Sequence, residues 1–174
     1  MRPRRILEIG TFYGRSTATI CSAIQSMKTA ARFVTIDLDF RSEEQMQKAF
    51  AEIHGTEEAP MPGECREAFE LGLSTTDHAR QNLRKHGLAE LVSLESGDFR
   101  GLPGTFDFVF ADVLHEGNEI RRNLADILAK IEPGGILAAH DLNDENRGLI
   151  DSLAPGAEFV SRCGTLGIYR IGGA

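Results

Sequence analysis

The chain has 174 residues, of which 41% are hydrophobic and 26% are charged, and its formal net charge is -7. This length and composition are typical of one globular domain, and the acidic balance argues against a nucleic-acid surface, which is normally basic. No apolar run approaches the roughly 18 residues that a bilayer span needs, so we expect no membrane partner. From the length we expect a single domain, residues 1–174. Three cysteines without a C-x-x-C spacing indicate reduced thiols, so we expect the protein in the cytoplasm.

The chain opens with a predicted strand, a glycine-bearing turn and a helix. Residues 5–9 form a short apolar strand that contains Glu8, and the turn leads into a helix over 14–28. Glycine lets a backbone approach a ligand closely, and the N–H groups at a helix start favour electron-rich groups. In the E-x-G-x-x-x-G spacing, Phe12 stands where a dinucleotide fingerprint needs its middle glycine, so a nucleoside without a pyrophosphate fits better. The alternative is a structural turn of another doubly wound protein.

A second strand over 32–36 ends at Asp37, where folds of this kind bind ribose hydroxyls, although a turn or cap acid is the alternative. An insertion, residues 40–74, then interrupts the alternation of strands and helices. Its pattern predicts a helix over 42–53, a loop over 55–63 and a short helix over 64–73. Such a segment serves as a lid or substrate wall, or is a surface excursion or an oligomer contact.

The remaining elements alternate in the same way and end in a strand pair. The patterns predict a helix over 75–87, strands over 91–95 and 106–111, a helix over 116–131 broken at 132–135, a strand over 136–139, a helix over 144–153, and hairpin strands over 157–163 and 166–171. This order predicts an α/β fold with a doubly wound, Rossmann-like, mostly parallel sheet and a C-terminal antiparallel hairpin.

Polar residues follow the predicted strands at their carboxyl ends, the edge where open α/β sheets bind ligands. These residues are Glu8, Asp37, Asp98, Asp112 and the pair His140-Asp141. Asp98 is placed to accept a hydrogen bond from a purine amino group, with Phe99 beside the ring, although an aspartate in a Gly-Asp turn is common without a ligand.

Six motifs in this order resemble those of class I S-adenosylmethionine-dependent methyltransferases. They are E-I-G-x-x-x-G-R-S-T, I-D-L-D, A-R-x-N-L-x-x-H-G-L, S-G-D-F, F-D-F-V-F-A-D-V-L-H and E-P-G-G-I-L-A-A-H-D, and they cover nearly the whole chain except residues 40–74. The resemblance implies a seven-stranded sheet. The D-x-x-H and H-D motifs look closest to small-molecule O-methyltransferases, including antibiotic sugar O-methyltransferases, several of which use Mg²⁺.

The resemblance also implies which residues bind S-adenosylmethionine. Its methionine end would be lined by Glu8, Gly10, Thr11, Phe12, Tyr13 and Gly14, with Ser16 and Thr17 at the helix start beside the carboxylate. Asp37 would hold the ribose, Asp98 the adenine amino group, and Phe99 would lie against the adenine ring.

The chemistry expected beside this cofactor is removal of a proton from a hydroxyl acceptor. Asp112 and Asp141 end adjacent strands, so their carboxylates can converge on one Mg²⁺, with Asn143 or Asp144 as a third ligand. His115 has an ordinary pKa suited to a general base near neutral pH. The alternative is a site without a metal, in which Asp112 contacts the cofactor's amino group and His140 is a packed histidine.

We therefore expect O-methylation of a small hydroxylated molecule, a sugar or a phenol, in an enzyme that is a homodimer by default. One alternative is a metal-independent N-methyltransferase, in which His115 is dispensable. Another is a non-catalytic nucleoside-binding protein, which would use Glu8, Asp37 and Asp98 but be indifferent to Asp112, His115 and Asp141.

Overall fold

The structure is a computed structural model that describes residues 2–54, 66 and 69–172. Its strands are β1 (Arg5–Ile9), β2 (Arg32–Asp37), β3 (Ser93–Ser96), β4 (Phe106–Ala111), β5 (Ile131–Ala139), β6 (Ala157–Cys163) and β7 (Leu166–Ile171). Its helices are α1 (Arg15–Met27), α2 (Glu43–His54), α4 (Thr75–Lys85), α5 (Gly117–Ala129) and α6 (Asp144–Leu153), with short 3₁₀ turns at Ala89–Leu91 and Phe99–Gly101.

The seven strands form one sheet in the order β3-β2-β1-β4-β5-β7-β6. The pairs from β3 to β5 are parallel, whereas β7 is antiparallel to both β5 and β6. The predicted fold class, a mostly parallel sheet with a C-terminal antiparallel pair, is therefore confirmed. The strand order reverses direction at β1, which lies between β2 and β4, and such a switch point is where open sheets bind ligands.

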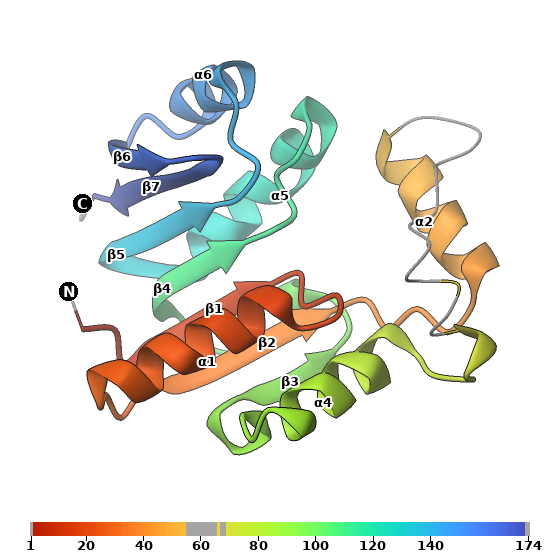
Figure 1. Ribbon diagram of the computed structural model, residues 1–174. Helices are drawn as coiled ribbons and strands as arrows, with labels where there is room; N and C mark the ends of the chain where they lie inside the picture. The colour runs from red at the N-terminus through yellow and green to blue at the C-terminus, as the bar shows by residue number, and fades with distance from the viewer. Residues whose placement is uncertain (1, 55–65, 67–68, 173–174) are drawn as a thin grey trace.

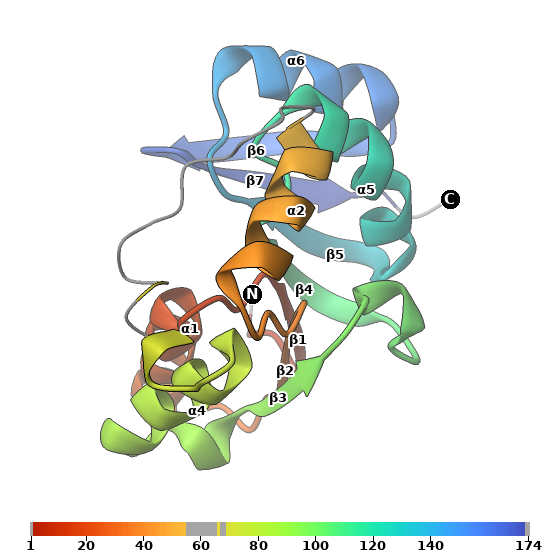
Figure 2. The same cartoon turned by 90° about the vertical axis from the view of Figure 1, so that its right-hand side faces the viewer.

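Helices cover both faces of the sheet (Figures 1 and 2). Ile6 and Phe33 pack with α1 and α4, whereas the next residues in each strand, Leu7 and Val34, pack in the core that α5 and α6 cover. This alternation follows from the pleat, which directs successive side chains to opposite faces. Because both faces are buried, the exposed carboxyl edge is the part of the sheet left for ligands.

Helix α2 stands beyond the carboxyl ends of the parallel strands (Figure 1). Its Met46 is buried, and Phe50 contacts Phe40 edge to face, at 6.1 Å between ring centroids. Most of the loop and short helix predicted over 55–73 lies outside the described residues. The position of α2 suits a wall beside the carboxyl edge, and its role as a lid stays a prediction.

The boundary between α5 and β5 differs from the prediction. The helix was expected to reach residue 131 and to break at 132–135, but α5 ends at Ala129 and β5 already begins at Ile131. Ile131 pairs with Phe106 and Ile136 with Phe108, so the Pro-Gly-Gly residues between them form an irregularity inside the strand. A bulge accommodates Pro133, which has no N–H to donate to a neighbouring strand.

No helix in the described part of the chain is long and apolar enough to cross a membrane.

Candidate functional site

The turn between β1 and α1 is held against the ends of β2 and β4. Gly10 donates its N–H to the Ile36 carbonyl at 3.0 Å, and Asp112 donates its N–H to the Ile9 carbonyl at 2.8 Å. Gly10 has φ +98°, and a Cβ there would lie 2.9 Å from the Asp112 carbonyl oxygen. Glycine is therefore required at this position by both conformation and space. The first residue of the turn therefore packs directly against Asp112 at the end of β4.

Two further backbone features shape this turn. Phe12 has φ +46°, and Gly14, with φ +81°, is the residue that precedes α1. The Phe12 and Tyr13 rings are stacked at 4.1 Å, and Tyr13 lies 4.4 Å from the His78 ring of α4. The turn residues Thr11 to Tyr13 thus lie at the switch point, where the sequence predicts the methionine end of a cofactor.

Glu8 lies fully buried beneath the turn. Its Oε2 accepts hydrogen bonds from the hydroxyls of Thr17 at 2.5 Å and Thr35 at 2.6 Å. Burial raises the pKa of Glu8 to about 7, although the hydroxyls of Ser16, Thr17 and Thr35 lower it in part. Oε1 is buried and has no hydrogen-bond partner among the described residues. This oxygen can accept a hydrogen bond from a bound donor.

Asp37 lies at the end of β2, and its carboxylate accepts the N–H of Phe12. Burial raises the pKa of Asp37 to about 6, against the effect of the backbone N–H groups of Phe12, Leu38 and Thr11. Asp37 therefore anchors the glycine turn in this structure. Its predicted contact with ribose hydroxyls stays a prediction, since one carboxylate can accept several hydrogen bonds.

Asp98 is more exposed and lies beside Asp37, because Gly97 donates its N–H to the Asp37 carbonyl at 2.8 Å. The backbone N–H of Arg100 is the main cause that lowers the pKa of Asp98, and the Arg100 guanidinium is 3.2 Å away. Phe99 is only 6% exposed, and Arg100 lies over its ring at 4.8 Å. Stacking of an adenine on Phe99 requires Arg100 to move, so that contact also stays a prediction.

Four side chains from the ends of β4 and β5 converge. They are Asp112, His115, His140 and Asp141, and one ligand atom from each lies within 4.8 Å of all the others. Asp112 Oδ1 is 3.2 Å from His115 Nε2 and 2.8 Å from His140 Nδ1. Burial raises the pKa of Asp112, but His115 and His140 lower it below its usual value overall. The structure thus brings together the three residues predicted for chemistry, Asp112, His115 and Asp141.

His115 is held from behind by α5. Its Nδ1 lies 3.0 Å from Glu119 Oε2, which also accepts the His115 backbone N–H at 2.8 Å. Hydrogen bonds to Asp112 and Glu119 raise the pKa of His115 to about 10. The raised pKa favours the imidazolium form, in which both ring nitrogens donate hydrogen bonds and neither can accept one. The predicted general base therefore needs Asp112 to be engaged elsewhere before it can take a proton.

The third metal ligand expected from Asn143 or Asp144 has another role in this structure. Asn143 Oδ1 accepts the Asn146 backbone N–H at 2.8 Å and caps α6, and Asp144 pairs with Arg162 at 2.9 Å from a side chain that is 94% exposed. Sequence reasoning gave His140 no role in binding and did not single out Glu119. Two signals in the sequence could have pointed to these roles. His140 is adjacent to Asp141, and Glu119 lies in the first turn of α5.

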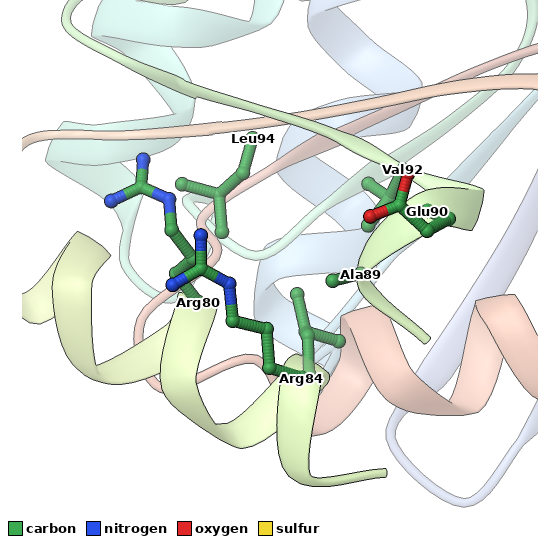
Figure 3. Close-up of a pocket in the computed structure, with 7 residues that line it drawn as sticks. Arg80, Arg84, Ala89, Glu90, Val92 and Leu94 are labelled. Atoms are coloured by element: carbon green, nitrogen blue, oxygen red, sulfur yellow. The ribbon is translucent and has the colours of Figure 1, made fainter. Parts of the chain in front are cut away.

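A separate small pocket lies between α4 and the amino end of the edge strand β3 (Figure 3). It is lined by Arg80, Leu83, Arg84, Ala89, Glu90, Val92 and Leu94. Its volume of about 160 Å³ is below that of ordinary ligand pockets, which begin near ~300 Å³. None of the predicted site residues lines it, so we place the candidate site at the carboxyl edge.

The chain belongs to a family of methyltransferase domains. The family's model, described as "Methyltransferase domain", matches residues 7–142, which include the glycine turn and all four clustered side chains. A ribosomal protein L11 methyltransferase of Exiguobacterium sp. is 29% identical over 93 residues, which cover 53% of this chain and 29% of that protein. The chain spans less than a third of the length of the curated relatives it matches.

Solved structures share the fold at low sequence identity. A SAM-dependent O-methyltransferase from Thermotoga maritima has a TM-score of 0.62 at 14% identity, covering 98% of this chain and 60% of that one. A methyltransferase of Podospora anserina, bound to SAH, has a TM-score of 0.56 at 18% identity, covering 99% and 72%. At these identities the likeness establishes the fold, whereas the reaction must be argued from the site.

Proposed function

We propose that this protein is an S-adenosylmethionine-dependent O-methyltransferase whose acceptor is a small hydroxylated molecule, a sugar or a phenol. The observation that carries the proposal is the contact between the glycine turn and the end of β4. Gly10 packs against Asp112, so a cofactor in the turn lies next to the cluster of Asp112, His115, His140 and Asp141. A methyl donor and a group that handles the acceptor's proton are thereby adjacent.

The residues of the turn suit the methionine end of this cofactor. The buried Oε1 of Glu8 lacks a partner, and an ammonium group is the donor that would satisfy it. The N–H groups at the start of α1 favour a carboxylate. Asp37 and Asp98, joined through Gly97, provide acceptors for the ribose hydroxyls and the adenine amino group. The turn does not suit a pyrophosphate, because Phe12 stands where the dinucleotide-binding fingerprint has its middle glycine.

When bound, S-adenosylmethionine supplies an electrophilic methyl group, and the protein's part is to orient the acceptor oxygen in line with it. His115 Nε2 is the group placed to take the hydroxyl proton, because Glu119 engages Nδ1 and leaves Nε2 directed at Asp112. This role requires a positive charge that engages Asp112 in place of His115. A divalent cation held by Asp112 and Asp141 would supply that charge and would also favour the alkoxide form of an acceptor.

The similarity to ribosomal protein L11 methyltransferases favours a second candidate, methylation of a protein side chain. A nitrogen acceptor that is neutral when it reacts needs less help from a base or a cation. In that case loss of His115 or Asp141 would leave the transfer rate largely unchanged, which distinguishes the two candidates.

The first test is calorimetric titration of S-adenosylmethionine into the purified chain. We expect saturable binding, and we expect Glu8→Gln to weaken it about tenfold or more, because a buried charge-assisted hydrogen bond is lost. Glu158→Gln, at an exposed position on β6, makes the same chemical change away from the turn and should bind like the unaltered chain. Absence of binding would overturn the proposed activity.

The second test identifies the class of acceptor by measuring transfer of a labelled methyl group from S-adenosylmethionine. Sugars and phenols are compared with a ribosomal protein mixture, using the unaltered chain and His115→Ala. Labelling of hydroxylated small molecules that is lost in His115→Ala supports the proposal. Labelling of protein that His115→Ala retains supports the second candidate.

A further inference from the structure

We infer that Arg100 is a positioning residue for the cofactor. Held by α5, it fixes the Asp98 carboxylate in the orientation that accepts a hydrogen bond from the adenine amino group, and it thereby makes the site select an aminopurine over an oxopurine. The inference rests on the proposed function, because it concerns the adenine end of the S-adenosylmethionine site. Its basis is a series of contacts that leads from Asp98 through Arg100 to α5.

Asp98 lies at the carboxyl edge of the sheet, but burial does not fix its side chain. The side chain is 56% exposed, whereas the backbone beside it is held by the hydrogen bond from Gly97 to the Asp37 carbonyl. An exposed aspartate samples several rotamers, and restricting them when a ligand binds costs conformational entropy. A carboxylate in this position recognises a base better when a neighbour fixes its orientation before the ligand arrives.

Arg100 contacts both oxygens of this carboxylate. Its backbone N–H donates to Asp98 Oδ1 at 2.9 Å, and its Nη1 lies 3.2 Å from both Oδ1 and Oδ2. The backbone N–H, followed by the guanidinium, lowers the pKa of Asp98, so the carboxylate is ionised and acts only as an acceptor. Oδ1 has two donors, whereas Oδ2 has one among the described residues. Oδ2 therefore keeps a lone pair for an adenine amino group.

Helix α5 holds the Arg100 guanidinium on its other side. Nε donates to Asp126 Oδ2 at 2.5 Å, and Nη2 donates to Asn123 Oδ1 at 3.0 Å and to the Arg122 carbonyl at 3.1 Å. The Asn123 amide is itself fixed, because its Nδ2 donates to the Val113 carbonyl at 3.2 Å. All three nitrogens of the guanidinium thus have partners. Since the group is planar and rigid, it holds Asp98 at a small cost in side-chain freedom.

The same contacts place the guanidinium over the Phe99 ring, 4.8 Å from the ring centroid. Phe99 belongs to the buried core, and Lys130 holds the backbone of this turn by donating to the carbonyls of Arg100 and Leu102. Because the guanidinium occupies a face of the Phe99 ring, recognition of the base depends on hydrogen bonding at its edge more than on stacking.

A fixed, ionised carboxylate selects an amino group. Adenine presents an N–H donor at its amino position, whereas hypoxanthine presents a carbonyl oxygen there, and two facing acceptors form no hydrogen bond. Hypoxanthine does carry an N–H on the adjacent ring nitrogen, so a mobile carboxylate can turn to it. A carboxylate held by Arg100 cannot turn in this way. The preference for adenine therefore measures how firmly Asp98 is oriented.

The test compares two affinities by calorimetry. The ligands are S-adenosylhomocysteine, the product of the proposed reaction, and its inosine analogue, in which hypoxanthine replaces adenine. We expect the unaltered chain to bind the adenosine ligand about tenfold or more tightly than the inosine ligand, because a hydrogen bond to a charged group is lost. In Arg100→Ala the two affinities should come to within about twofold of each other, because Asp98 is then mobile.

Two further variants separate positioning from a general structural role. Asp126→Asn removes the charged partner of Nε on α5 without altering Arg100 or Asp98, and it should also lower the adenine preference. Arg147→Ala is the matched control, because Arg147 likewise lies over an aromatic ring, that of Phe159, and pairs with a carboxylate. Its ring partner belongs to β6, at the opposite edge of the sheet from β3, so this variant should keep the full preference.

A purely structural role for Arg100 predicts a different result. Arg100→Ala would then weaken both ligands equally and leave the adenine preference unchanged, which would overturn the inference. An unaltered chain without adenine preference would overturn it as well. If Arg100→Ala does not fold, Asp126→Asn decides the question, and a full preference in that variant would reject the positioning role.

The two proposals fail in distinguishable ways. If the unaltered chain binds neither ligand, the proposed function is rejected and the inference is rejected with it. If the chain binds both ligands equally well, the role of Arg100 is rejected and the proposed function stands.

Discussion

Glu8 shows how one buried residue gives the stability of the whole protein a pH dependence. Its pKa is raised from 4.5 to about 7 by burial. Between these values the folded chain keeps a proton that the unfolded chain releases, so the free energy of unfolding falls as pH rises from about 4.5 to 7 and then levels off. At about 1.4 kcal/mol per pKa unit, this amounts to about 3 kcal/mol.

Glu8→Gln removes that titration while keeping an oxygen for the hydroxyls of Thr17 and Thr35. We expect the unfolding free energy of the variant, minus that of the unaltered chain, to grow by about 3 kcal/mol between pH 4.5 and 8. Urea denaturation across this pH range measures it. Glu158→Gln, which makes the same chemical change at an exposed position on β6, is the control. A difference for Glu8→Gln that changes with pH no more than that of the control would contradict the raised pKa of Glu8.

At the scale of an element, the turn between β1 and α1 depends on the absence of a side chain at Gly10. A Cβ there would meet the Asp112 carbonyl oxygen at 2.9 Å and the Asp112 Cβ at 3.1 Å. Gly87, after α4, has φ +68° and no heavy atom within 4 Å of the corresponding point. The two glycines therefore separate backbone strain from crowding.

We expect Gly87→Ala to lower the unfolding free energy by about 1–2 kcal/mol, the cost of a left-handed residue. Gly10→Ala should lower it by a further 1–3 kcal/mol, roughly the cost of overpacking, because the ends of β1 and β4 must separate. Chemical denaturation compares the two variants. Equal losses would show that the turn can move away from Asp112 without cost, and the proposed coupling between the cofactor and acceptor sides would lose its basis.

The elements differ in how well the sequence predicts them. The bounds of β1, β4, α6, β6 and β7 match the predicted ranges, because each shows clear periodicity between turn residues. The start of β5 was missed because Pro133 and two glycines usually end an element. Here the first residues of β4, Phe106 and Phe108, pair with β5 on both sides of the irregularity, and this tertiary contact is not visible in the local sequence.

For the molecule as a whole, strand order was enough to bring the predicted residues Asp112, His115 and Asp141 to one edge, but the participation of His140 in their cluster was not predicted. His140 and Asp141 directly follow β5, and both of their side chains reach the cluster. They do so because β5 ends at Ala139 and Asp141 takes a positive φ. Neither the positive φ of Asp141 nor the burial of Glu119 behind His115 can be read from the local sequence.

The same architecture predicts where the protein opens most easily. β1 is paired on both sides and nearly fully buried, whereas β3 and β6 are edge strands with mostly exposed residues. Because opening free energy follows burial and hydrogen bonding, amide hydrogens in β1 and β4 should exchange with solvent most slowly, and those in β3 and β6 much faster.

A bound ligand that recognises only the folded state slows exchange in the segments it holds closed. S-adenosylmethionine should therefore protect residues 10–17 and the ends of β2 and β3, while β6 and β7 on the far side of the sheet provide the internal control. Hydrogen exchange followed by mass spectrometry measures both effects in one experiment. Protection confined to the β6–β7 hairpin would place the ligand away from the switch point. That result would overturn the assignment of the carboxyl edge of the sheet as the site.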